Sequence, residues 1–178
     1  MKKALLATAT LSLLLTSGAA FAQSDNFSTG SVSFIGEVST GSCDMAPVDD
    51  VKLGSVTVKK FADANAHGSW GTTTIKFEGC DLGEGDDKVQ SMTLTVVGDT
   101  AHSGNADLWP NAGLANNVGV EVEIEGKKLI PADGLVVEKQ FGANATTMNF
   151  SVRGRMVSTG SATAGDVKLN LPFVADFL

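Results

Sequence analysis

The sequence has few of the residues that perform catalysis or bind metals. Its two histidines, His67 and His102, each lie in a loop rich in glycine, serine and asparagine, and no metal-ligand spacing surrounds either of them. The sequence also lacks a Gly-x-Ser-x-Gly turn, a phosphate-binding glycine loop and an HExxH pair. No class of enzyme is therefore indicated, and neither a cofactor nor a metal is expected.

One loop, with the sequence CDLGEGDDK, does gather carboxylates, from Asp81, Glu84, Asp86 and Asp87. Clustered carboxylates can bind calcium, but these do not fall at the spacing of an EF-hand loop. A hairpin turn rich in glycine and aspartate accounts for the same residues without an ion. We therefore predict a hairpin loop, with calcium binding as the alternative.

Basic residues are also scarce, because 13 lysines and arginines stand against 20 aspartates and glutamates and the net charge is −7. The basic residues form neither the stripe that a phosphate backbone requires nor a polybasic patch for a membrane surface. Arg153 and Arg155 alternate with apolar residues, which indicates the solvated face of a strand rather than an anion site. We expect no nucleic-acid partner and no membrane insertion.

A long apolar run occurs only at the N-terminus. Lys2 and Lys3 precede the apolar run 4–15, and the small-residue site Ala20-Phe21-Ala22 follows, which is the pattern of a secretory signal. The run is too short to cross a bilayer. We therefore predict a signal peptide over residues 1–22, cleaved after Ala22, and the remaining length suits one domain with its own core.

Cysteine is limited to Cys43 and Cys80. In a chain that is exported into an oxidising compartment, an even number of cysteines predicts a disulfide, and the alternative is two buried free thiols.

Helical periodicity is scarce after residue 22, whereas alternation of apolar and polar residues recurs in short blocks separated by glycine, asparagine and aspartate. The many valines and threonines agree with an all-β chain. The expected strands are 31–38, 51–58, 72–80, 89–98, 118–126, 135–141, 147–157 and 166–178. Strands at this spacing predict a sandwich of the immunoglobulin type.

The last block places an apolar residue at every second position and then the chain ends. These residues are Val167, Leu169, Leu171, Phe173, Ala175 and Phe177. Pro172 lacks the N–H that a central strand would donate, so it suits an edge strand. Because a long apolar edge promotes aggregation unless it is covered, we predict an incomplete immunoglobulin-like sandwich that lacks its final strand and offers an open groove.

The start of the predicted mature chain supplies a segment that could fill such a groove. Residues 23–36 are small and polar at first and then alternate, with Ser28, Gly30, Val32 and Phe34 on one face of an extended chain. We predict that residues 23–36 form a donor-strand arm and residues 37–178 the domain that receives an arm from another copy. A head-to-tail contact of this kind does not close on itself and builds a filament.

Several motifs, taken in order, resemble the pilins of chaperone-usher fimbriae of the type 1 and P-like group. They are GSVSFIGEVSTGSC (30–43), VKLGSVTVKKF (51–61), TTTIKFEGCDL (72–82), and Gly165, fourteenth from the C-terminus and followed by the alternating strand. The sequence departs from the family in having Phe177 where tyrosine is usual, which retains an apolar ring and loses a hydroxyl.

The resemblance implies a structural subunit of a bacterial surface fimbria that supports cell adhesion. It implies three partners: a periplasmic chaperone that lends a strand against the segment from Gly165 to Phe177, an outer-membrane usher, and neighbouring pilin subunits. A major shaft subunit is the leading expectation and a minor adaptor is the alternative. A monomeric secreted module that binds sugar or protein through Trp70 or Trp109 is a further alternative, although Trp109 could instead cap the core.

Overall fold

The computed structural model describes residues 43–80, 90–141 and 145–178, and this part of the chain contains nine β-strands and no helix. The predicted signal peptide, the predicted arm 23–36 with Ser28, Gly30, Val32 and Phe34, and the strand 31–38 lie outside the described residues. The carboxylate loop with its calcium alternative also lies outside them. The predicted all-β class is confirmed.

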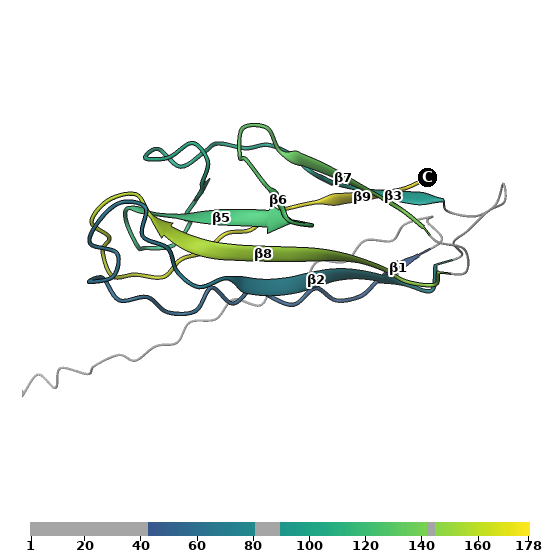
Figure 1. Cartoon of the computed structure of the whole chain (residues 1–178), viewed down its shortest axis with the longest axis horizontal. Helices are drawn as coiled ribbons and strands as arrows, with labels where there is room; N and C mark the ends of the chain where they lie inside the picture. Colours follow the sequence, from purple (N-terminus) through teal and green to yellow (C-terminus); the bar gives the residue numbers. More distant parts are fainter. Residues whose placement is uncertain (1–42, 81–89, 142–144) are drawn as a thin grey trace, which may run out of the picture. The chain divides into compact units, whose positions relative to one another are not determined.

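The strands form two antiparallel sheets (Figure 1). The larger sheet has the order β1-β2-β8-β5-β4, and β6 also pairs with β5. Its strands are β1 (Asp44–Met45), β2 (Gly71–Glu78), β4 (Trp109–Pro110), β5 (Val118–Ile124), β6 (Lys127–Lys128) and β8 (Met148–Ser158). The smaller sheet has the order β7-β3-β9, from β3 (Ser91–Val96), β7 (Leu135–Gln140) and β9 (Val174–Phe177).

Five predicted strands are confirmed with small changes at their ends, namely 72–80, 89–98, 118–126, 135–141 and 147–157. The prediction of a strand over 51–58 is wrong, because this segment has no ladder partner. Its backbone lies against the larger sheet at Gly71, where an added Cβ would be 2.2 Å from the carbonyl oxygen of Lys52. The segment therefore packs onto the sheet through close backbone contact instead of extending it.

The main core fills the space between the two sheets and is built from the apolar side of each alternating strand. Phe77 lies at its centre, edge-to-face with Phe150 at 6.2 Å and with Phe177 at 5.8 Å between ring centroids. Fully burying a side chain of this kind is worth roughly 1.5 to 3 kcal/mol. A second cluster contains Phe61, Ala115, Val118, Met156 and Ala162.

The two sheets are also joined by polar contacts on the β7 side. The ammonium of Lys139 in β7 lies 2.8 Å from a carboxylate oxygen of Glu125 and donates to the carbonyl oxygen of Asn149 at 2.6 Å. The other carboxylate oxygen of Glu125 accepts from the backbone N–H of Ser151. Burial alone would raise the pKa of Glu125, but the hydrogen bond from Lys139, the N–H of Ser151 and the charge of Lys139 together lower it.

A disulfide joins Cys43, which precedes β1, to Cys80, which follows β2. The predicted pairing is therefore present, and the alternative of two free thiols is wrong. The bond closes a loop with a sequence separation of 37, for which the loop-entropy relation gives about 4 kcal/mol of stabilisation. It fixes the beginning of the described chain beside the end of β2.

Candidate functional site

The C-terminal segment is half-buried in strict alternation. From Val167 to Phe177 every odd residue is partly buried and every even residue is exposed, and all the odd side chains pack against the main core. The odd residues are Val167, Leu169, Leu171, Phe173, Ala175 and Phe177. The alternation that the sequence predicts is therefore present, but none of these side chains is fully covered.

Incomplete burial has a structural cause in the position of β9. This strand pairs with β3 alone, in a register that places Phe177 opposite Met92 and Ala175 opposite Leu94. Its other edge has no ladder partner among the described residues. The backbone groups and the apolar side chains on that edge are therefore available to a further strand.

The ladder is shorter than the sequence predicts, because only Val174–Phe177 of the expected strand 166–178 belongs to it. The segment before β9 is held by the loop 111–115 instead. The N–H of Ala115 donates to the carbonyl of Asp166 at 3.1 Å, and the N–H of Ala112 donates to the carbonyl of Lys168 at 2.9 Å. The side-chain oxygen of Asn111 accepts from the N–H of Lys168 at 2.8 Å.

Gly165 lies at the start of this segment and fits closely against the same loop. A Cβ added there would be 2.4 Å from the backbone nitrogen of Ala115 and 2.6 Å from the carbonyl carbon of Leu114. Both are backbone atoms, which cannot rotate away as the end of a side chain can. A residue without a side chain is therefore required for the segment to lie where it does.

The carboxylate of Asp166 adds to this anchor. It pairs with the ammonium of Lys168 at 2.7 Å and accepts from the N–H of Leu114 at 2.9 Å. The hydrogen bond from Lys168, followed by the one from Leu114, holds the pKa of Asp166 below its ordinary value. These contacts fix the direction in which the half-buried segment leaves the loop.

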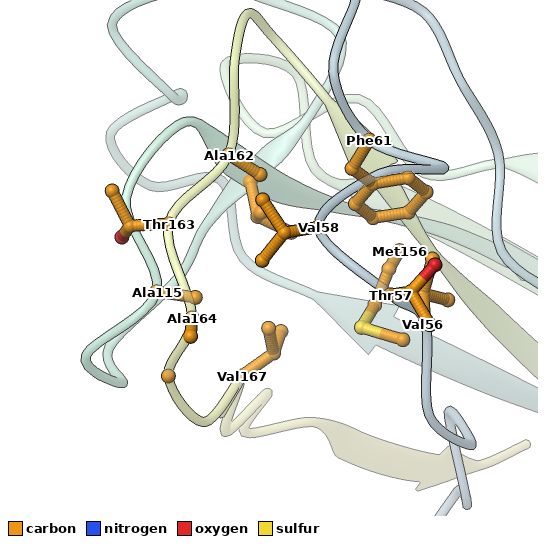
Figure 2. A pocket seen from close by; sticks show the side chains of 12 residues that line it. Val56, Thr57, Val58, Phe61, Ala115, Met156, Ala162, Thr163, Ala164 and Val167 are labelled. Atoms are coloured by element: carbon orange, nitrogen blue, oxygen red, sulfur yellow. The ribbon is translucent and has the colours of Figure 1, made fainter.

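Two open cavities lie between the start of this segment and the segment 53–58. Their volumes are about 300 Å³ and about 280 Å³, and both are lined by Val56, Met156, Gly165 and Val167. Figure 2 shows Val167 and Val56 around the larger cavity, together with Phe61 from the second cluster. The segment 53–58 is thus a second wall, facing the start of the C-terminal segment across a gap.

Chemically, the site presents apolar side chains and unpaired strand backbone. An extended peptide with apolar residues at alternate positions has both complements, since its backbone pairs with an open edge and its side chains enter the gaps. The site brings together the predicted groove residues from Gly165 to Phe177. The sequence did not reveal that Asn111 holds this segment or that 53–58 forms a second wall. The alternation in 53–58 indicated only that the segment is extended and buries one side.

The two tryptophans lie in different surroundings, one in the core and one against two arginines. Trp109 is 3% exposed, and its indole N–H donates to the carbonyl of Leu129 at 3.0 Å, so it belongs to the core. The alternative that Trp109 stacks on a sugar is therefore wrong. The ring of Trp70 lies 4.5 Å and 4.4 Å from the guanidinium carbons of Arg153 and Arg155.

The two arginines lie on the outward face of β8 and are occupied by carboxylates from β5. Arg153 forms an ion pair with Glu123, and Arg155 forms one with Glu121 at 2.6 Å. The side chain of Arg153 is 44% exposed, which agrees with the predicted solvated strand face. In the described part of the chain, no helix has the length and apolar character that crossing a membrane requires.

Comparison with known proteins identifies the family and the fold. The family described as fimbrial protein matches residues 32–177. The fimbrial subunit type 1 of Klebsiella pneumoniae is 30% identical over 181 residues, which cover 99% of this chain and 100% of that protein.

Solved pilus structures share the fold. A chain in the structure of a chaperone-usher pilus, determined in a study of rod uncoiling, aligns with a TM-score of 0.59 and 18% identity and covers 84% of this chain and 96% of that chain. The P pilus rod subunit PapA aligns with a TM-score of 0.57 and 16% identity, over 78% of this chain and 100% of that chain. The chain therefore belongs to the fimbrial protein family and is a structural subunit of a cell-surface fimbria, not an enzyme.

Proposed function

We propose that the subunit polymerises by donor-strand complementation, in which the arm 23–36 of one copy lies in the groove of the next. In this scheme residues 1–22 are removed and residues 37–178 form the pilin domain. One observation carries the proposal: the apolar side chains from Val167 to Phe177 are half-buried along an edge that has no ladder partner in the described residues. An inserted strand would complete both the burial and the hydrogen bonding.

The arm supplies what the groove lacks. Val32 and Phe34 are its largest apolar residues on the face that also carries Ser28 and Gly30. Full burial of each of the two is worth roughly 1.5 to 3 kcal/mol, and backbone pairing along the open edge adds to this. Gly30 lets the backbone of the arm approach the groove closely, because it has no side chain.

The same groove gives the subunit its assembly partners. A periplasmic chaperone would cover the apolar edge before polymerisation by lending a strand, with the C-terminal carboxylate of Leu178 bound in its cleft. An outer-membrane usher would then exchange that strand for the arm of the next subunit. Exposed apolar edges aggregate when uncovered, so a temporary strand is physically required if the arm of the same copy does not fill the groove.

Within the fibre we propose the role of major shaft subunit, with a minor adaptor as the alternative. Similarity to a type 1 fimbrial subunit and to a rod subunit supports the shaft role. The burial of Trp109 weakens the alternative of a monomeric sugar-binding module, because it removes one of the two tryptophans available to stack on a sugar. Deleting the gene from its host should therefore remove most of the fibre mass that shearing releases.

The arm is tested by two matched variants of the full chain, expressed with its chaperone and usher. Val32→Asp with Phe34→Asp places charge on the face expected to enter the groove, and Ser31→Asp with Ser33→Asp places the same charge on the opposite face. We expect the first to abolish surface fibres and the second to retain them. If fibre yield and the ladder of undissociated subunits on unboiled gels were equal in both variants, donor-strand complementation through this face would be wrong.

A further inference from the structure

The outward face of the smaller sheet carries one exposed valine on each of its two outer strands, β7 and β9, on either side of a threonine in β3. Val136 in β7 and Val174 in β9 flank Thr95 in β3 in the ladder register, and they are 59% and 52% exposed. Val97, just after β3, is 67% exposed, and Leu178 is 66% exposed. Single exposed apolar residues are ordinary on a protein surface, so the charge that accompanies these residues decides what kind of partner the face fits.

The charge on this face has one sign. Glu138 and Asp176 flank Thr93 in the neighbouring row of the ladder. No outward position of β7, β3 or β9 is a lysine or arginine, and Lys139 is turned inward to Glu125. We call the set Val97, Val136, Glu138, Val174, Asp176 and Leu178 the acidic-apolar face.

A second exposed patch on the same chain has the opposite character. Val58 is 45% exposed, and it is followed by the exposed lysines Lys59 and Lys60 in a turn. We call Val58, Lys59 and Lys60 the basic-apolar patch; it borders the groove, because Val58 lines the larger cavity (Figure 2).

The lysines of this patch are distinctive in an acidic chain. Of the lysines and arginines in the described residues, Lys59, Lys60 and Lys127 form no ion pair within the part of the chain that the structure describes. Two of these three lie side by side next to exposed Val58. A surface that combines apolar side chains with unneutralised positive charge matches one that combines apolar side chains with negative charge.

We propose that the acidic-apolar face of one subunit docks on the basic-apolar patch of another copy, as a second contact between subunits besides the arm in the groove. The two surfaces differ, so the contact is heterologous and repeats along a filament without closing. Its continuity with the groove at Val58 allows both contacts to form in one fibre. This inference rests on the proposed function, because the second contact forms between copies that their arms have already linked.

The test uses charge exchange in fibres of the full chain, viewed by negative-stain electron microscopy. One variant carries Lys59→Glu with Lys60→Glu, a second carries Glu138→Lys with Asp176→Lys, and a third carries all four changes. The control is Lys127→Glu, which removes the remaining lysine without an ion pair and lies in neither surface.

We expect each two-residue exchange to reduce the fraction of fibre length that has the uniform wild-type diameter by at least about tenfold, because like charges then face each other. The four-residue exchange should restore that fraction, and the control should leave it unchanged. The ladder on unboiled gels should persist in every variant, because it reports the arm contact alone.

Equal diameters in all variants, or no restoration by the four-residue exchange, would overturn the proposed contact. Loss of the ladder in the two-residue variants would also overturn it, because the changes would then act on the arm contact. Failure of the proposed function is recognised separately, by fibres that survive Val32→Asp with Phe34→Asp.

Discussion

Replacing Gly165 should destabilise the protein by an amount that can be calculated, because the atoms that would crowd a side chain there belong to the backbone and cannot rotate away. Replacing Gly165 by alanine places a Cβ 2.4 Å from the backbone nitrogen of Ala115 and 2.8 Å from its Cα. Contacts this short force the segment and the loop apart. The hydrogen bond from the N–H of Ala115 to Asp166, now 3.1 Å, is the first that the separation would lengthen.

The cost follows from two contributions. Forcing an extra methyl group into a packed contact costs typically 1 to 3 kcal/mol, and losing one backbone hydrogen bond adds about 1 kcal/mol. We therefore expect Gly165→Ala to lower the free energy of unfolding by about 2 to 4 kcal/mol. Equilibrium urea unfolding of the purified mature chain, followed by tryptophan fluorescence, measures this change.

Gly160 supplies the matched control, because it lies five residues away and an added Cβ would be 3.7 Å or more from every neighbouring atom. Its backbone has no left-handed conformation that would exclude alanine. Gly160→Ala should therefore change stability by less than about 1 kcal/mol, in the stabilising direction if at all. Equal unfolding midpoints for the two variants would refute the close-approach explanation for Gly165.

Two further predictions concern the ends of the sandwich. Phe177→Ala removes the edge-to-face contact with Phe77 and should lower the free energy of unfolding by about 1 to 3 kcal/mol. Phe177→Tyr should stay within about 0.5 kcal/mol, because it keeps the ring and the side chain is only partly buried; a larger loss for tyrosine than for alanine would contradict the contact. For Glu125, the folded pKa lies below its unfolded value, so the stabilisation from Lys139 and Ser151 is present above the unfolded pKa and is lost as the pH falls through the folded pKa. Glu125→Gln should therefore be less stable than wild type at pH 7, by less than about 1 kcal/mol for a partly exposed pair. The difference should shrink as the pH falls below the ordinary glutamate pKa; a difference in thermal unfolding that does not change as the carboxylate is protonated would show that the charge plays no part.

The sequence predicted the burial pattern of the C-terminal segment well, because that prediction depended on periodicity alone. Alternation from Val167 to Phe177 correctly identified the side chains that face the core, because the side-chain period of an extended chain holds whether or not a ladder forms. The extent of the ladder could not be predicted in the same way. Asp166 and Lys168, at the start of the segment, form hydrogen bonds with the loop 111–115 instead of with a strand, and this loop has no signature in the sequence.

For the segment 51–58 as well, the sequence pattern could not predict whether a ladder forms. Its alternation resembles that of a strand, yet it lies on the sheet at Gly71 and forms a wall of the groove. Nothing in the local pattern tells whether an extended segment will find a ladder partner, because that depends on residues distant in the chain. The short strands β1, β4 and β6 escaped prediction because two residues carry no period.

Trp109 illustrates a choice that only three-dimensional packing could decide. A tryptophan between aspartate, leucine and proline suits either an exposed stacking surface or a core cap. The carbonyl of Leu129, twenty residues along the chain, provides the partner that its indole N–H needs when buried. This hydrogen bond forms only in the folded chain, so the residues next to Trp109 could not reveal that it is buried.

Site-specific photo-crosslinking tests the central claim most directly. Two tagged versions of the full chain are assembled into one fibre, one of them carrying Phe34→benzoylphenylalanine, and cross-linked peptides are identified by mass spectrometry after irradiation. The account predicts links from position 34 of one tagged copy to residues within 53–58 or 165–177 of the other. Links confined to a single copy, or directed outside these two segments, would contradict polymerisation through the groove.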